Sequence, residues 1–214
     1  MRSLKLKVFS TLFLAGAVWG GCQFRARKIN NWDVSNLSAR DEKIVCFGDS
    51  LVAGVGAKEP TGSYPAQLSR ALNREVIALG KPGETSQQGL KRLREHPEIT
   101  QCPVIVTLGG NDLLRRLPWA ETEAALSGIF TELRRRGCLV AFTGIEVLGG
   151  NRKKHKRLCK RNGVILIPDV LGDISNEKTL KNDPIHPNDA GYRIMAERVA
   201  EHLKPFLQVK EFSP

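Results

Sequence analysis

Residues 44–51 read IVCFGDSL, a short apolar, β-branched run that leads directly into a glycine, an aspartate and a serine. Similar short apolar runs follow along the chain, at residues 76–79, 104–108, 139–143 and 164–167. A strand that is apolar at successive positions is buried on both faces, which is typical of a parallel sheet covered by helices. We therefore interpret these runs, beginning with 44–47, as the strands of one parallel sheet.

Amphipathic segments separate the apolar runs. We expect helices at residues 64–72, 86–95, 118–136, 151–161 and 188–203. In the last of these, Tyr192, Val199 and Leu203 fall on one stripe, and charged residues lie opposite. This alternation predicts an α/β fold in which helices connect parallel strands, without an internal repeat or a second domain.

The composition is that of a globular domain with a substantial core. The chain has 214 residues, of which 41% are hydrophobic and 26% are charged. This balance excludes a disordered chain, a collagen-like repeat and a small disulfide scaffold. The net charge of +11 favours anionic partners such as nucleic acid or acidic lipid, without choosing between them. The 5 cysteines include no C-x-x-C pair, which argues against a zinc site or a redox motif.

The N-terminus has the features of an export signal. Basic residues precede an apolar run at 8–19, which ends in Gly20, Gly21 and Cys22. The run is too short for a membrane-spanning helix, which needs about 20 residues, so a signal peptide over 1–21 fits better. The alternative is that this N-terminal segment forms a helix that remains part of the domain. Small residues before a cysteine resemble a bacterial lipoprotein signal, which implies a lipid on Cys22.

The N-terminal signal sets the expected organisation of the chain. A signal peptide over 1–21 is followed by a polar tether over 22–42, a catalytic domain over 43–207 and a C-terminal tail over 208–214. With a lipid on Cys22, the protein would be an exported, periplasmic and membrane-anchored lipoprotein of a bacterium.

Glycines and polar residues stand at the ends of the first three predicted strands. The segments are Gly48-Asp49-Ser50-Leu51, the turn around Gly83, and Gly109-Gly110-Asn111-Asp112. A serine placed just after a buried strand, with a glycine two residues earlier, can expose its hydroxyl on a tight turn. Its own N–H is then free to bind an oxyanion. The alternative is a turn in which serine or aspartate caps a helix.

A second signal precedes the last predicted helix. Asp183 stands three residues before His186, and Pro184 and Pro187 restrict the backbone around them. At this spacing the carboxylate can hold Nδ1 of the histidine while Nε2 faces a neighbouring strand end. A capping aspartate with a surface histidine is the alternative for this segment alone. Together with Ser50, the pair indicates a serine hydrolase.

These segments, in this order and spacing, resemble the four sequence blocks of the SGNH (GDSL) hydrolases. Residues 63–66 and 83–90 are most similar to the bacterial periplasmic thioesterase, lysophospholipase and arylesterase branch. The resemblance implies a three-layer, flavodoxin-like α/β/α sandwich with a five-stranded parallel sheet. It also implies hydrolysis of carboxylic esters or thioesters without a metal or a cofactor.

The resemblance assigns a role to each matching residue. Ser50 would be the nucleophile, His186 the general base and Asp183 the residue that orients His186. The oxyanion-hole donors would be the N–H groups of Ser50 and Gly83 and the side-chain amide of Asn111. The carboxylates of Asp49 and Asp112 would fix the turns that carry these donors.

The expected substrate is a small acyl ester, a lysophospholipid or a thioester. The connection between 143 and 164 is short, which suits a short acyl chain, and an O-acetylated carbohydrate or peptidoglycan is the alternative substrate.

Residues 152–161 carry seven positive charges, which either form a solvated face or contact acidic lipid beside the anchor at Cys22. A non-catalytic surface protein that binds an anionic polymer is disfavoured, because it would not need Ser50, Asp183 and His186 together. We expect a monomer without specific nucleic-acid binding.

Overall fold

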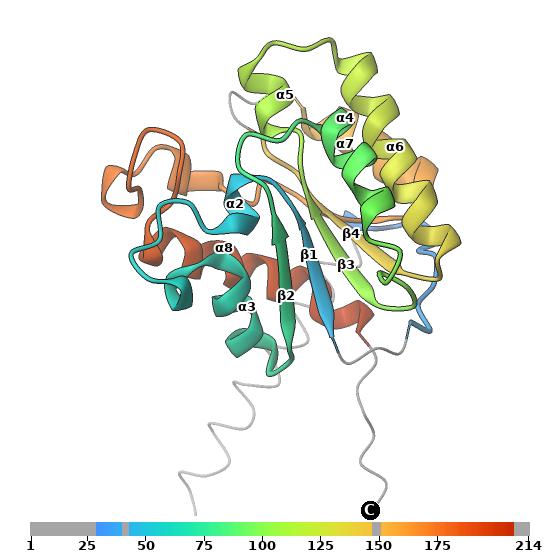
Figure 1. Cartoon of the computed structure of the whole chain (residues 1–214), viewed down its shortest axis with the longest axis horizontal. Coiled ribbons are helices and arrows are strands. Elements are labelled where there is room, and N and C mark those ends of the chain that lie inside the picture. The colour runs from blue at the N-terminus through green and yellow to red at the C-terminus, as the bar shows by residue number, and fades with distance from the viewer. Residues whose placement is uncertain (1–28, 40–42, 147–150, 208–214) are drawn as a thin grey trace, which may run out of the picture.

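The computed structural model describes residues 29–39, 43–146 and 151–207, and within them the chain forms a five-stranded parallel sheet. The strand order is β2-β1-β3-β4-β5, so the chain starts in the interior of the sheet and builds outward in both directions (Figure 1). The strands are β1 (Ile44–Gly48), β2 (Val76–Gly80), β3 (Pro103–Thr107), β4 (Leu139–Thr143) and β5 (Ile165–Ile167). Each predicted strand is confirmed to within one residue.

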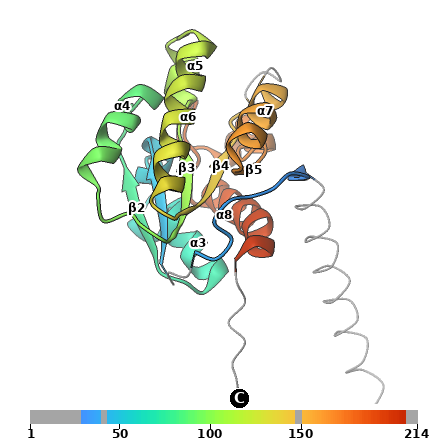
Figure 2. The same ribbon diagram turned by 90° about the vertical axis from the view of Figure 1, so that its right-hand side faces the viewer.

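Helices cover both faces of the sheet (Figures 1 and 2). The longer helices are α3 (Tyr64–Leu72), α4 (Ser86–Arg92), α6 (Trp119–Arg135), α7 (Arg152–Asn162) and α8 (Asp189–Leu203). Helices α3 and α8 pack on one face, whereas α4, α6 and α7 pack on the other. This is the three-layer α/β/α sandwich that the sequence predicts.

Short elements lie between the longer ones. They are the helices α2 (Ser50–Ala53) and α5 (Gly110–Leu114) and the 3₁₀ turns η1 (Pro60–Gly62), η2 (Leu93–Glu95), η4 (Gly172–Ser175), η5 (Lys178–Leu180) and η6 (Lys204–Phe206). The end of the helix predicted at 86–95 is one of these 3₁₀ turns. Neither α2 nor α5 was predicted, because four or five residues carry too little periodicity.

Alternate residues of strand β1 enter the two cores. Ile44 and Cys46 join the core beneath α3 and α8, whereas Val45 and Phe47 join the core beneath α4 and α6. At the end of the strand, a Cβ on Gly48 would lie 2.2 Å from the carbonyl oxygen of Thr107. Glycine therefore lets β1 approach β3 closely where the chain turns into α2.

Residues 29–39 correct the prediction of a tether over 22–42, because this part of the segment is bound along the edge strand β5. The side-chain amide of Asn30 accepts a hydrogen bond from Leu166 N (2.7 Å) and donates one to Leu166 O (3.2 Å). Trp32 Nε1 donates to Val164 O, and Asn36 Nδ2 donates to Cys138 O. At Leu166, the Asn30 amide satisfies the open edge of the sheet as a further strand would, whereas Trp32 and Asn36 bind carbonyl groups just before β5 and β4. The predicted signal peptide, Cys22 and the tail over 208–214 lie outside the described residues.

Within the described residues, no helix combines the length and the apolar character needed to cross a membrane. The cysteines of this part of the chain are Cys46, Cys102, Cys138 and Cys159, and all are buried. Each acts as a small apolar side chain in the core.

The buried His155 on α7 makes the stability of the fold sensitive to acid. Its ring packs between Trp119 and Phe142, at centroid distances of 5.6 and 5.3 Å. Among the described residues, its Nδ1 has no hydrogen-bond partner. Burial, together with the adjacent charge of Lys154, lowers the pKa of His155 to about 4.

Below pH ~6.5, the unfolded chain binds a proton at this histidine that the folded chain does not bind. We therefore expect the free energy of unfolding to fall as the pH drops from about 6.5 to about 4, by about 2–3 kcal/mol from this residue. Urea unfolding at pH 7 and pH 4.5 should show a larger loss for the wild type than for His155→Phe, in which the aromatic packing is kept. Equal losses in the two proteins would contradict this account.

Candidate active site

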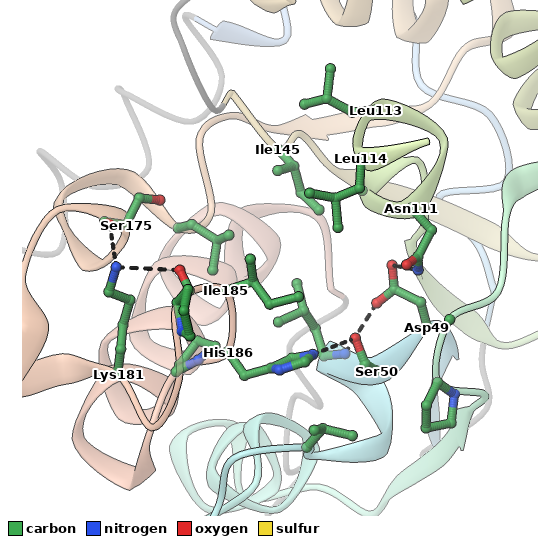
Figure 3. Close-up of a pocket in the computed structure, with 18 of the residues that line it drawn as sticks. Asp49, Ser50, Asn111, Leu113, Leu114, Ile145, Ser175, Lys181, Ile185 and His186 are labelled. Atoms are coloured by element: carbon green, nitrogen blue, oxygen red, sulfur yellow. Dashed lines mark hydrogen bonds between the residues drawn. The ribbon is translucent and has the colours of Figure 1, made fainter. Parts of the chain in front are cut away.

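The predicted site residues meet at the carboxyl ends of the strands, around one cavity (Figure 3). Ser50 is the first residue of α2, which follows β1 directly. Asp49 caps this helix, because its Oδ1 accepts a hydrogen bond from Leu51 N at 3.0 Å. The cap fixes the turn that places the Ser50 hydroxyl at the cavity.

Ser50, His186 and Asp183 form a continuous hydrogen-bonded series. His186 Nε2 lies 3.0 Å from Ser50 Oγ, and His186 Nδ1 lies 2.7 Å from Asp183 Oδ2. An ionised carboxylate accepts the Nδ1 proton, which leaves Nε2 as the acceptor facing the serine. The series is thus arranged to move a proton from Ser50 to His186.

Asp183 remains ionised well below neutral pH. Burial alone would raise its pKa, but hydrogen bonds to the carboxylate from the His186 ring and from the N–H groups of Ile185 and His186 outweigh burial. The pKa of Asp183 is lowered to about 2. The two N–H bonds, 2.9 and 2.8 Å long, also tie the carboxylate to its own loop.

The loop that carries Asp183 and His186 is fixed from both sides. Asn182 N donates to His186 O at 2.9 Å, which closes the loop on itself. Lys181 Nζ donates to Ser175 O at 2.7 Å and joins the loop to the preceding segment. After the histidine, the Asn188 side chain caps α8 through the N–H groups of Ala190 and Gly191. This rigidity is what holds the imidazole over a serine 136 residues away.

Asn111 and Gly83 lie beside Ser50 at the same cavity. Asn111 Nδ2 donates to Glu84 O at 3.0 Å and lies 3.4 Å from Asp49 Oδ2. Gly83 has a φ of +75°, in the left-handed region that favours glycine. An added Cβ would contact only Arg115 Nη2, at 3.8 Å, so the backbone conformation and not crowding within the chain calls for glycine here.

The two aspartates expected to support the site do so through hydrogen bonds. Asp112 Oδ2 accepts from Ser86 N at 2.8 Å and its Oδ1 accepts from Thr122 Oγ1 at 3.2 Å, so it joins α4, α5 and α6. Asp49 is buried, and burial raises its pKa to about 7 despite the N–H of Leu51 and the nearby His186, which oppose the shift. Its charge therefore changes close to neutral pH.

A buried ion pair beneath the site was not anticipated from the sequence. Arg92 binds both carboxylate oxygens of Glu84, with Nη2 2.6 Å from Oε2 and Nε 2.8 Å from Oε1. The same guanidinium donates to Gly48 O at 3.1 Å and lies 4.1 Å from the ring centroid of Phe47. Glu84 precedes the N-cap of α4 and Arg92 is the last residue of that helix, so the pair stands eight residues apart, a spacing that marks no local pattern.

The cavity next to Ser50 has a volume of about 360 Å³ and mostly apolar walls. Leu113, Leu114 and Ile145 lie across from the Ser50–His186 pair, as Figure 3 shows. The other apolar lining residues are Leu51, Val55, Pro82, Leu171, Ile174, Pro184, Ile185 and Pro187. Within the described residues, no cluster of His, Cys, Asp and Glu is placed to hold a metal ion.

A parallel α/β/α sandwich with a Ser–His–Asp series at its strand ends defines an ester hydrolase of the SGNH class. The chain belongs to the GDSL-like lipase/acylhydrolase family, whose model matches residues 46–194. The resemblance stated from the sequence blocks is thereby confirmed.

Relatives in this family carry names of ester and thioester hydrolases. The chain is 26% identical over 185 residues to thioesterase 1/protease 1/lysophospholipase L1 of Escherichia coli K12, covering 79% of this chain and 87% of that protein. It is 27% identical over 188 residues to esterase TesA of Pseudomonas aeruginosa, covering 79% and 91%. A crystal structure of TesA superposes with a TM-score of 0.71 at 26% identity, covering 77% of this chain and 99% of that one.

The position of Asn111 leads to a kinetic prediction. An amide that binds charge present only in the transition state contributes to kcat and little to KM. We expect Asn111→Ala to lower kcat on a nitrophenyl ester by about a hundredfold or more, with a small change in KM. Asn176→Ala, at an exposed asparagine outside the cavity lining, is the matched control. A loss confined to KM would instead assign Asn111 to binding of the ground-state substrate.

Proposed function

We propose that this protein cleaves the carboxylic ester or thioester bond of acyl substrates with Ser50 as nucleophile, His186 as general base and Asp183 as the residue that orients His186. The single observation that carries the proposal is the hydrogen-bonded series from Ser50 Oγ through His186 to Asp183, with distances of 3.0 and 2.7 Å, at the mouth of an apolar cavity. Membership of the hydrolase family supports it.

The geometry accounts for each step of acyl transfer. His186 Nε2 takes the proton of Ser50 as Oγ forms a bond to the carbonyl carbon. The N–H groups of Ser50 and Gly83 and the amide of Asn111 bind the resulting oxyanion. The carbon–oxygen or carbon–sulfur bond then breaks, and His186 returns the proton to the leaving group. Water attacks the acyl-serine by the same route, which releases the acid and restores Ser50.

The walls of the cavity favour an acyl chain over a sugar. Leu113, Leu114, Ile145 and Ile174 offer an apolar surface, whereas recognition of a carbohydrate ring needs polar partners for its hydroxyl groups. The names of the relatives, thioesterase, lysophospholipase and esterase, point to the same substrate class. We therefore place an acyl ester, a lysophospholipid or a thioester ahead of an O-acetylated glycan.

Substitution of the proposed triad tests this function. Ser50→Ala and His186→Ala should each lower turnover by about three or more orders of magnitude, and the double variant should be little worse, because the residues act as a unit. The measurement is hydrolysis of nitrophenyl esters from acetate to palmitate, beside lysophosphatidylcholine, an acyl thioester and an acetylated glycan. An organophosphonate should label Ser50. Labelling at another residue, or an unchanged rate in Ser50→Ala, would overturn the proposal.

We also propose that the protein is exported and held at a bacterial membrane by a lipid on Cys22. The apolar run at 8–19 and the small residues before Cys22 support the export signal. Helix α7 adds exposed basic side chains, among them Arg152, Lys153 and Lys156, which suit contact with acidic headgroups. A single acyl chain binds a membrane only reversibly, whereas several chains or one chain with a basic patch anchor a protein stably.

Fractionation of bacterial cells tests the anchor. The full-length protein should sediment with membranes and resist extraction by high salt, and Cys22→Ser should release it or change its processing. Mass spectrometry of the N-terminal peptide provides the direct readout. An unmodified N-terminus beyond Cys22, or an intact Met1, would exclude the lipoprotein and leave the hydrolase proposal standing.

A further inference from the structure

Exposed apolar side chains gather at the mouth of the candidate site. Leu113, Leu114, Leu117 and Ile185 are 38%, 59%, 37% and 49% exposed, and we call these four residues the apolar rim. Leu113, Leu114 and Ile185 line the cavity itself, whereas Leu117, on the loop between α5 and α6, lines a neighbouring cavity together with Leu113. Among the described residues, one other large apolar side chain is comparably exposed, and it is Leu37.

Basic residues stand next to the apolar rim. Arg115 and Arg116 are exposed within the same loop, and Arg115 Nη2 donates to Gly83 O at 2.7 Å. Helix α7 begins beside this loop, because Lys154 Nζ lies 5.4 Å from the ring centroid of Trp119. Figures 1 and 2 both show α5 and α7 at the same end of the molecule. We call the exposed arginines and lysines here the basic flank: Arg115, Arg116, Arg152, Lys153 and Lys156.

We propose that the apolar rim and the basic flank dock on an anionic lipid surface, from which the cavity receives its acyl substrate. Isolated exposed leucines are ordinary, but an apolar patch edged by one sign of charge suits a surface that offers acyl chains beneath anionic headgroups. Glu121 is the exposed acidic residue at the start of α6, so cations outnumber anions along this edge. The substrate part of this inference rests on the proposed function.

The path of the N-terminal segment agrees with this orientation. Asn30 is bonded to Leu166 near the carboxyl end of β5, so Ile29 leaves the domain at the end of the sheet that carries the site. Cys22 precedes Ile29 by seven residues, and seven extended residues span at most about 25 Å. A lipid on Cys22 would therefore keep Ile29 within about 25 Å of the membrane surface.

A paired substitution separates docking from catalysis. Arg116 has a φ of +56°, a conformation that asparagine tolerates, so Leu117→Ser/Arg116→Asn removes one apolar and one basic side chain without straining the loop. The matched control is Leu37→Ser/Arg135→Gln, because both residues are exposed and lie near the opposite end of the sheet. The parent and all variants are made as residues 22–214 with Cys22→Ser. This chain keeps every described residue and cannot be lipidated at position 22.

Flotation with phosphatidylglycerol or phosphatidylcholine vesicles measures the docking. The parent chain should prefer phosphatidylglycerol, and the rim variant should lose about tenfold in that association, while the control should match the parent. Hydrolysis of nitrophenyl palmitate dispersed in phosphatidylglycerol should fall in parallel, and hydrolysis of soluble nitrophenyl acetate should not change. A rim variant that floats like the parent, or a parent without preference for the anionic lipid, would overturn the inference. If the parent hydrolyses neither ester, the proposed function fails, and flotation still decides the docking.

Discussion

The ion pair between Glu84 and Arg92 connects the strand ends on which the candidate site is built. Through Nη1 and Nη2, Arg92 donates to the carbonyl oxygens of Leu79, the penultimate residue of β2, and Gly48, the last residue of β1. The carbonyl of Glu84 receives the Asn111 amide from the segment after β3. Both side chains are withdrawn from solvent, with 11% and 1% of Arg92 and Glu84 exposed. Removal of one partner would leave an unpaired buried charge, which costs about 3–5 kcal/mol, so the pair contributes to the stability of these strand ends only while both residues are present.

Further hydrogen bonds around this ion pair explain how segments that are distant in sequence form one site. The Asp49 cap fixes Ser50, the two hydrogen bonds of Asp112 fix the starts of α4 and α6, and the closed loop before α8 fixes His186. None of these interactions depends on a bound substrate. The proposed nucleophile Ser50 and the proposed base His186 are therefore already oriented before substrate binds, and little reorganisation of these two side chains is required during the proposed reaction.

Local patterns predicted the elements of the fold but not the contacts between them. The apolar runs at 44–47 and 139–143 and the amphipathic segment at 64–72 each carry enough residues to reveal strand or helix. The position of Asn30 could not be predicted in this way, because an asparagine in a polar stretch is also typical of a loop. Its role depends on Leu166, 136 residues later. The pairing of Glu84 with Arg92 was missed because a separation of eight residues matches neither of the side-chain spacings that meet on a helix, whereas Asp183 and His186 were found because they stand three residues apart beside two prolines.

Helix α5 is five residues long and carries both a residue of the candidate site and residues of the apolar rim. Asn111 lies in its first turn beside the cavity, and Leu113 and Leu114 follow at its end on the apolar rim. So short a helix cannot bend independently at its two ends, and Arg115, directly after it, is bonded to Gly83 O. The proposed oxyanion donor and two residues of the apolar rim therefore lie on one short segment of backbone, which places the proposed chemistry directly beside the surface proposed to dock on lipid.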